Sequence, residues 1–317
     1  MGAVLRGKMR YNKADKNAGI EPAVSEGGTM SAEALNILVT LDCNYLHQLN
    51  VMLTSLLERE EGFVRLFLLS RGEMTDEQLA NTRLVLAGRG ELCPITIREE
   101  QLQGAPTTDR YPLEIYYRIF AAKYLPQELD RVLYLDPDLV INQSIRHLYR
   151  LPMGTAFFAA ASHIGNLLHI VNELRLDMDE TSPYINSGVM LMNLRQLRQE
   201  QDYAQVFDYI EAHKNRLILP DQDIISGLYG GRIIPLDAWR YNMTERLFAF
   251  HRQAGDRMDL DFVRENCAII HYCGRNKPWK NNYIGRLDCF YKEAETKYLE
   301  KLGRTEKQSQ DGQEPEG

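Results

Sequence analysis

The chain has 317 residues, of which 44% are hydrophobic and 26% are charged, and its formal net charge is −7. These proportions are typical of a globular protein with a substantial core, built as one large α/β domain or two small ones. The negative charge argues against a general nucleic-acid binder, because such proteins are usually basic.

The cysteines and the chain ends indicate where the protein works. Five cysteines, an odd number with no C-x-x-C pair, favour a reducing compartment over a disulfide framework or a zinc site. The longest weakly polar run, around residues 156–161, is far too short to cross a bilayer, and the N-terminus carries no signal pattern. We therefore expect a cytoplasmic protein with disordered tails at residues 1–34 and 305–317.

Strand and helix patterns alternate along the first hundred residues of the expected domain. Strands are predicted at 36–41, 64–69 and 93–97, with helices at 45–59 and 75–87 between them. This alternation predicts an α/β fold with a mostly parallel sheet. Ligands of such sheets bind at the carboxyl ends of the strands. Further helices are expected at 114–124, at 202–215 and from Pro220, and further strands at 156–161, 184–193 and 266–271.

The segment RVLYLDPDLVI, residues 131–141, combines a buried strand with an acidic tip. Its apolar run ends at Asp136-Pro137-Asp138, where the proline stops ladder pairing. Two carboxylates so close together are costly without a cation between them, and their oxygens suit Mg²⁺ or Mn²⁺. The Asp-x-Asp spacing recurs elsewhere in the chain, so the prediction depends on the buried strand that precedes these aspartates and on the proline between them. The alternative is a solvated turn at the end of the strand.

The turn after the first strand, Asp42-Cys43-Asn44-Tyr45, contains no glycine. A dinucleotide-binding turn or a P-loop needs glycines there to wrap a phosphate, so this turn does not bind phosphate in that way. Asp42 and Asn44 offer hydrogen-bonding groups to a base or ribose, and Tyr45 offers a stacking face. The alternative is that Asp42 or Asn44 only caps the following helix.

Two interrupted patterns mark further candidate residues. Arg118 interrupts the apolar positions of helix 114–124, so it either points at a substrate or lies along the surface with its charge in water. Ser187-Gly188 breaks strand 184–193, which indicates a bulge or the close approach of a ligand. Asn186, beside this break, can both donate and accept hydrogen bonds.

The segment that begins at Pro220 is a helix start with Asp221 and Asp223 in its first turn. Helix capping would explain both aspartates, but it leaves Gln222 between them unexplained.

The last strand ends in His271 and leads into a basic loop that contains glycine. Residues 275–304 carry eight Lys or Arg against four Asp or Glu, so an anionic diphosphate could be held there. A lone histidine is more often structural than a ligand, and that alternative stays open. The apolar stripe in this region either packs on the core or lies on a membrane; it consists of Ile284, Leu287, Tyr291, Ala294 and Tyr298.

Four motifs, LDCNY, YLDPDLV, INSGVMLMN with the later DQD, and HYCGRNKPW, together resemble glycosyltransferase family eight in order and spacing. That family includes bacterial lipopolysaccharide α-galactosyltransferases and glycogenins, and the resemblance runs from about residue 36 to 280. It implies a single-domain glycosyltransferase A (Rossmann-like) fold with a mixed, mostly parallel sheet over residues 35–304, whose basic helical segment begins at about 275. It also implies a UDP-sugar donor and Mn²⁺, with Mg²⁺ as the alternative ion. Cys43 departs mildly from the pattern, because some relatives carry an acidic residue there.

The resemblance also implies roles for matching residues. The metal ligands would be Asp136, Asp138 and His271. Asp42, Asn44 and Tyr45 would hold uridine, with Tyr45 stacked on the base, and Thr40 and Pro137 would belong to the same donor site. Arg118, Asn186, Ser187, Asp221 and Gln222 would line the sugar, and Gly274 and Lys277 would hold the diphosphate. Gln222, Asp221 and Lys277 would be the catalytic residues.

The implied reaction moves a hexose, galactose or glucose, to an acceptor hydroxyl with retention at the anomeric carbon. Charge develops on the β-phosphate, where the metal and Lys277 would stabilise it. Gln222 is an amide and a poor nucleophile, which favours attack by the acceptor on the same face over a double displacement. The acceptor would be a glycan or a lipid-linked sugar, as in cell-surface or lipopolysaccharide synthesis, and the basic segment could contact the inner face of the membrane.

Two rival functions remain. A sugar-nucleotide nucleotidyltransferase would carry a glycine-rich loop after the first strand, and this chain has none there. A non-catalytic nucleotide-sugar-binding protein would share every motif, but it would not release UDP.

Overall fold

The computed structural model describes residues 33–98, 114–162, 166–253 and 258–311. The tail expected at 1–34 lies outside this part of the chain, except for Glu33 and Ala34. No helix among the described residues combines the length and the apolar character needed to cross a membrane.

A seven-stranded mixed sheet organises the fold, in the order β3-β2-β1-β4-β7-β6-β8. Strands β3, β2, β1 and β4 run parallel, β7 is antiparallel to both of its neighbours, and β8 is parallel to β6. This arrangement confirms the predicted α/β class and the mostly parallel sheet. The strands are β1 (Leu35–Thr40), β2 (Val64–Ser70), β3 (Gly90–Thr96), β4 (Arg131–Leu135), β6 (Phe158–Ala161), β7 (Val189–Asn193) and β8 (Ile233–Leu236).

A second, two-stranded sheet pairs β5 (Leu139–Ile141) with β9 (Ile269–His271). The helices connect and cover the two sheets. They are η1 (Cys43–Tyr45), α1 (Leu46–Arg59), α2 (Asp76–Leu86), α3 (Glu114–Ile119), α4 (Ala121–Tyr124), α5 (Arg146–Tyr149), α6 (Asn166–Leu176), α7 (Leu194–Glu200), α8 (Tyr203–His213), α9 (Pro220–Tyr229), η3 (Gly230–Arg232), α10 (Ala238–Tyr241), α11 (Glu245–Gln253), α12 (Leu260–Asn266) and α13 (Asp288–Asp311).

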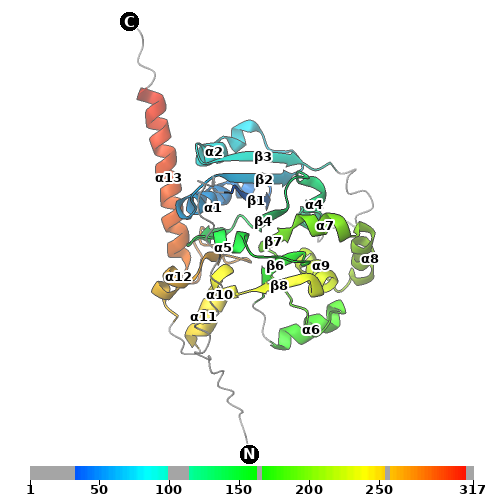
Figure 1. The fold of residues 1–317 in the computed structure, drawn as a ribbon. Helices are drawn as coiled ribbons and strands as arrows, with labels where there is room; N and C mark the ends of the chain where they lie inside the picture. The colour runs from blue at the N-terminus through cyan, green and yellow to red at the C-terminus, as the bar shows by residue number, and fades with distance from the viewer. Residues whose placement is uncertain (1–32, 99–113, 163–165, 254–257, 312–317) are drawn as a thin grey trace, which may run out of the picture. The chain divides into compact units, whose positions relative to one another are not determined.

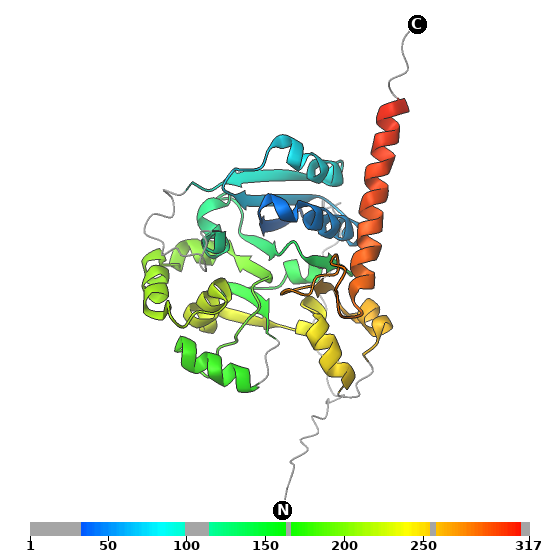
Figure 2. The ribbon, with the colours of Figure 1, turned by 180° about the vertical axis from the view of Figure 1, so that it is seen from behind.

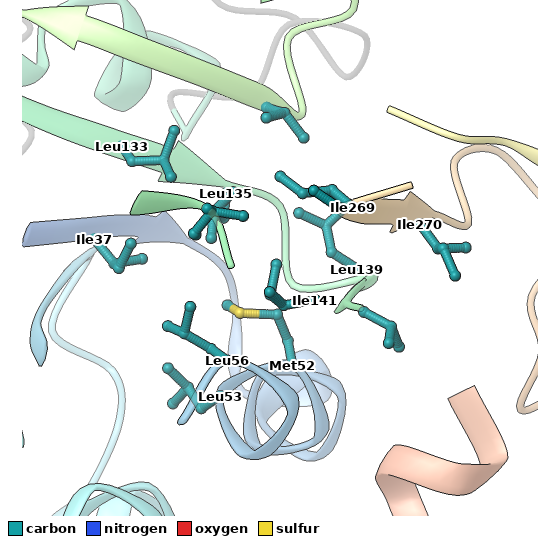
Figure 3. Packing of buried hydrophobic residues seen from close by; sticks show 14 of the residues in the cluster. Ile37, Met52, Leu53, Leu56, Leu133, Leu135, Leu139, Ile141, Ile269 and Ile270 are labelled. Atoms are coloured by element: carbon teal, nitrogen blue, oxygen red, sulfur yellow. The ribbon is translucent and has the colours of Figure 1, made fainter. Parts of the chain in front are cut away.

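The central strands bury side chains on both faces of the large sheet. In β4, Leu133 and Leu135 belong to one apolar cluster, whereas Val132 and Tyr134 belong to another on the opposite face. The first cluster is completed by α1 and by the small sheet, and Figure 3 shows Met52 of α1 next to Ile141 of β5, with Leu139 and Ile269 beyond it. Helix α13 lies next to α1, on the side away from α8, in both views (Figures 1 and 2).

Several expected boundaries differ from those in the structure. The predicted helix 114–124 is divided at Phe120 into α3 and α4. Strand β7 begins only at Val189, because residues 187 and 188 form a turn. Helix α2 starts as predicted, with reciprocal hydrogen bonds between Thr75 and Gln78.

The C-terminal tail expected at 305–317 is wrong for its first seven residues, because α13 continues to Asp311. Residues 305–310, TEKQSQ, contain mostly good helix formers, so the helix propagates beyond its packed part. The apolar stripe packs on the core, since Leu287, Tyr291 and Tyr298 are at most 2% exposed. Only Ile284, which precedes the helix, is exposed.

Candidate functional site

The Asp136-Pro137-Asp138 segment is the link between the two sheets. It leaves the end of β4, where the Asp136 amide donates to the Gly188 carbonyl at 2.8 Å, and it leads into β5. Strand β5 pairs antiparallel with β9 in the register that sets Leu139 opposite His271. This pairing brings His271 to the two carboxylates although it lies more than 130 residues further along the chain.

Asp136, Asp138 and His271 form a compact group with the geometry of metal ligands. His271 Nε2 lies 3.3 Å from Asp138 Oδ1 and 3.7 Å from Asp136 Oδ2, and one ligand atom of each residue lies within 4.8 Å of the other two. Asp138 is 7% exposed and His271 is 1% exposed. Two carboxylate oxygens and one imidazole nitrogen form a donor set that suits a divalent cation.

Each of the two carboxylates accepts a hydrogen bond from a protein side chain through one oxygen and directs its other oxygen toward His271. Asp136 Oδ1 accepts a 2.7 Å hydrogen bond from the Tyr134 hydroxyl, and Asp138 Oδ2 accepts one from the Lys277 ammonium. Asp138 Oδ1 is buried and has no hydrogen-bond partner in the part of the chain that the structure describes. A buried unpaired carboxylate oxygen is costly, and a bound cation would remove that cost.

His271 likewise has one ring nitrogen in contact with a protein side chain and the other directed toward the carboxylates. Its Nδ1 lies 2.8 Å from Oδ1 of the fully buried Asn242, while its Nε2 is buried and, within the described ranges, has no hydrogen-bond partner. Asp138 Oδ1 and His271 Nε2 therefore face each other beside Asp136 Oδ2, and these three ligand atoms fit a divalent metal ion.

Gly188 closes this group from the side of β7. A Cβ atom at this position would lie 2.4 Å from His271 Cε1 and 2.6 Å from Asp136 Oδ2, closer than real Cβ contacts. The glycine break in the sequence thus corresponds to a close approach, and the neighbours that require it are the candidate ligands.

The ionisation of Asp138 follows from its neighbours. Burial alone would raise its pKa, but the neighbouring His271 and Lys277 outweigh burial and lower the pKa to about 2. Lys277 itself is 7% exposed and also donates to the Tyr272 carbonyl at 2.8 Å. The carboxylate is therefore ionised at neutral pH, as a metal ligand must be.

Arg118 lies inside the site, so the interpretation of this residue as a surface side chain is wrong. Its Nη1 is 2.9 Å from Asp221 Oδ2 and 3.3 Å from Asp136 Oδ1, and its guanidinium lies 4.5 Å from the centre of the Tyr134 ring. Thr40, at the end of β1, contacts the same group, with Oγ1 3.4 Å from Arg118 Nη2. Arg118 thus connects the tips of β1 and β4 with the start of α9.

The residues of the Asp221-Gln222-Asp223 segment have two kinds of contact: the first two contact other candidate site residues, and the third has a structural role. Asp221 Oδ2 accepts from the Ser187 hydroxyl at 2.9 Å, and Gln222 Oε1 accepts weakly from the Asn186 amide at 3.4 Å. These contacts bring four candidate sugar-site residues together. Capping does not explain Asp221, because Arg118 and Ser187 hold its carboxylate.

Asp223 is the structural member of this segment. It is fully buried and accepts two hydrogen bonds from Arg175, one from the Tyr184 hydroxyl and two from the backbone amides of Ile218 and Leu219. It therefore holds the start of α9 in place.

The turn after β1 lies at the carboxyl edge of the sheet, as expected. Asp42 caps η1, because its Oδ1 accepts a hydrogen bond from the backbone amide of Asn44 at 2.8 Å. Tyr45 meets the Trp279 ring edge to face, with centroids 6.4 Å apart, which joins this turn to the loop after His271. In that loop Gly274 adopts a left-handed φ of 83°.

Sequence reasoning missed three residues that complete the site. Tyr134 was counted only as part of an apolar strand, although its spacing of two from Asp136 could have suggested a shared face. Trp279 was part of a motif but had no assigned role. Asn242 belongs to no motif, and no sequence signal connects it with His271.

The sequence matches known glycosyltransferases over most of its length. A model of glycosyl transferase family 8 matches residues 36–283. Lipopolysaccharide 1,2-glucosyltransferase of Escherichia coli is 29% identical over 58% of this chain, but the match spans only 54% of that relative. The enzyme of the same name from strain K12 is 26% identical and is matched over 83% of this chain and 78% of its own. General stress protein A of Bacillus subtilis is 25% identical over 79% of this chain and 89% of its own.

Solved structures agree on the fold. A galactosyltransferase, LgtC, in complex with donor and acceptor sugar analogues, superimposes with a TM-score of 0.69 at 23% identity, covering 83% of this chain and 95% of that one. Glycosyltransferase GlyE of Streptococcus pneumoniae gives a TM-score of 0.63 at 19% identity, covering 86% of this chain and 64% of that one. The chain therefore belongs to glycosyltransferase family 8 and has the glycosyltransferase A fold.

Proposed function

We propose that this protein is a retaining, metal-dependent hexosyltransferase that moves galactose or glucose from a UDP-sugar to an acceptor hydroxyl. The observation that carries the proposal is the group formed by Asp136, Asp138 and His271, in which three buried or half-buried ligand atoms face one another at the carboxyl edge of the sheet. Relatives named as lipopolysaccharide glucosyltransferases support hexose transfer and a glycan or lipid-linked acceptor.

The metal would be Mn²⁺ or Mg²⁺, held by these three residues. When bound, such an ion supplies positive charge to the diphosphate leaving group. Carboxylate oxygens suit both ions, and the imidazole nitrogen favours the transition metal, Mn²⁺.

The two positively charged side chains of the site have different proposed roles. Lys277 lies beside Asp138, where its ammonium can also meet an oxygen of the diphosphate and stabilise the charge that develops there. Arg118 bridges Asp136 and Asp221, so it holds two carboxylates in place. The donor would run from Asp42, Asn44 and Tyr45 at the uridine end, past Gly274 and Lys277 at the diphosphate, to the sugar near Gln222.

The contacts of Asp221 and Gln222 favour attack by the acceptor on the face from which UDP departs. A double displacement needs a free carboxylate as the nucleophile. Asp221 Oδ2 already accepts from Ser187 and contacts Arg118, both of which reduce its nucleophilicity, and Gln222 is an amide. In the proposed mechanism the departing phosphate takes the acceptor proton.

Thermal unfolding tests donor binding first. The purified protein is heated with a panel of nucleotide sugars, each with and without Mn²⁺. A ligand at 100 times its dissociation constant that binds only the folded state adds about 2.7 kcal/mol of stability. We expect a metal-dependent shift with one UDP-sugar, and no shift with any of them would overturn the proposal.

Release of UDP then tests turnover. With the donor identified in this way, metal-dependent UDP release that an acceptor glycan accelerates supports transfer. Tight binding without any UDP release would instead identify a non-catalytic nucleotide-sugar-binding protein.

A further inference from the structure

Asn242 is a buried residue between α10 and α11 that touches a candidate metal ligand. It is 0% exposed, and its Oδ1 lies 2.8 Å from His271 Nδ1. Neither the sequence motifs nor the proposed mechanism gives it a role. An asparagine is costly to bury unless its polar atoms are used, so its contact with His271 calls for an explanation.

The backbone around Asn242 is attached to the same strand that carries His271. The Met243 amide donates to the Ile269 carbonyl at 3.0 Å, and the His271 amide donates to the Met243 carbonyl at 2.8 Å. At its other side, the Asn242 amide donates to the Ala238 carbonyl at 2.9 Å, which ends α10. Residues 242 and 243 therefore hold His271 by both its main chain and its ring.

The contact determines which ring nitrogen of His271 carries the proton. An amide oxygen only accepts hydrogen bonds, so Nδ1 must be the donor in this contact. When the ring is neutral, its lone pair is then on Nε2, the buried nitrogen that lies 3.3 Å from Asp138 Oδ1. A lone pair at that position is what a metal requires, whereas an Nε2–H group would repel the ion.

We propose that Asn242 is a positioning residue that fixes the Nδ1–H tautomer and the ring orientation of His271, so that Nε2 is ready to bind the metal. This inference rests on the proposed function in one respect, because it assumes that a divalent ion binds at Asp136, Asp138 and His271. Partners of this kind typically change metal affinity by about 10- to 100-fold when they are removed.

The test compares three variants. Asn242→Ala removes the acceptor, and Asn242→Asp keeps an acceptor oxygen at the same place. Asn50→Ala is the matched control, because Asn50 is also a buried asparagine, 2% exposed, with side-chain hydrogen bonds to Thr82 and Tyr298 instead of a site residue.

Two readouts separate positioning from general stability. Nitrogen-15 spectra of the metal-free protein report which nitrogen of His271 is protonated, with the resonance assigned through His271→Gln. Titration with Mn²⁺ in the presence of UDP gives the dissociation constant of the metal. Urea unfolding of each variant shows how much folding stability it has lost.

We expect the Nδ1–H form of His271 in the natural protein and a dissociation constant for Mn²⁺ that is about 10- to 100-fold higher in Asn242→Ala. Asn242→Asp should restore most of the affinity, and Asn50→Ala should leave it unchanged even if folding stability falls. A neutral His271 ring that carries its only proton on Nε2 in the natural protein would overturn the inference, and this result requires no variant to fold. Unchanged affinity in Asn242→Ala would also overturn it, whereas absence of Mn²⁺ binding to the natural protein would overturn the metal assignment itself.

Discussion

Replacing Gly188 by alanine is the most direct test of the candidate site, because one added methyl group enters the space between two proposed ligands. The new Cβ would lie 2.4 Å from His271 Cε1 and 2.6 Å from Asp136 Oδ2. Gly188 does not have a left-handed φ, so the backbone accepts alanine without strain. The effect of the substitution is therefore steric.

The size of the effect follows from these distances. Carbon atoms pack at about 3.5–4.0 Å, so the ring and the new methyl group must separate by roughly 1 Å. A displacement of about 1 Å in catalytic geometry costs on the order of 10²-fold in rate, or about 2.7 kcal/mol. The overpacked site should also lose about 1–3 kcal/mol of folding stability.

The assay measures kcat/KM for UDP release, the Mn²⁺ dissociation constant and the urea midpoint. Gly231→Ala is the matched control, since a Cβ there meets nothing within 4 Å. We expect both kcat/KM and metal affinity to fall in Gly188→Ala and to equal those of the natural protein in Gly231→Ala. Natural values of both quantities in Gly188→Ala would refute the assignment of the metal to this group.

Four further substitutions or treatments probe separate parts of the site. Asp138→Asn should lower turnover by roughly 10³-fold, because it removes a charged metal ligand, and steady-state kinetics with near-normal turnover would place the metal elsewhere. Lys277→Ala should lower kcat by roughly 10²-fold through loss of leaving-group stabilisation, and unchanged kinetics would contradict that role. Asp223→Asn should lower the free energy of unfolding in urea by about 3–5 kcal/mol, because Arg175 loses a buried charged partner. A folded variant should keep its Mn²⁺ affinity. A free energy of unfolding equal to that of the natural protein would show that the ion pair is dispensable. UDP at about 100 times its dissociation constant should slow alkylation of the exposed Cys43 by up to roughly 100-fold, measured by mass spectrometry, and equal rates would move the uridine away from this turn.

Local pattern in the sequence was enough to predict the parts of the site that lie on single elements. The apolar run before Asp136 predicts a buried strand with carboxylates at its tip, because side-chain alternation and a proline act within a few residues. The same holds for the break at Gly188, whereas the role expected of Gln222 came from the family resemblance. The α/β class followed from the alternation of strand and helix periods, which is also local.

The family resemblance, rather than any periodicity, connected His271 with the carboxylates. The physical connection is the pairing of β5 with β9, which depends on the register between segments far apart in the chain. Single-sequence patterns carry no information on such a register. The inward direction of Arg118 likewise depends on which carboxylates surround it after folding.

By itself, the sequence determined the order of the elements, the acidic tip at Asp136 and Asp138, and the glycine that lets neighbouring groups approach, since each depends on a few adjacent residues. Only the tertiary structure decided that Asn242 meets the ring of His271 and that Tyr134 holds Asp136. The physical reason is that an isolated polar residue becomes functional through the partner it finds after folding, and that partner is set by packing across the whole domain.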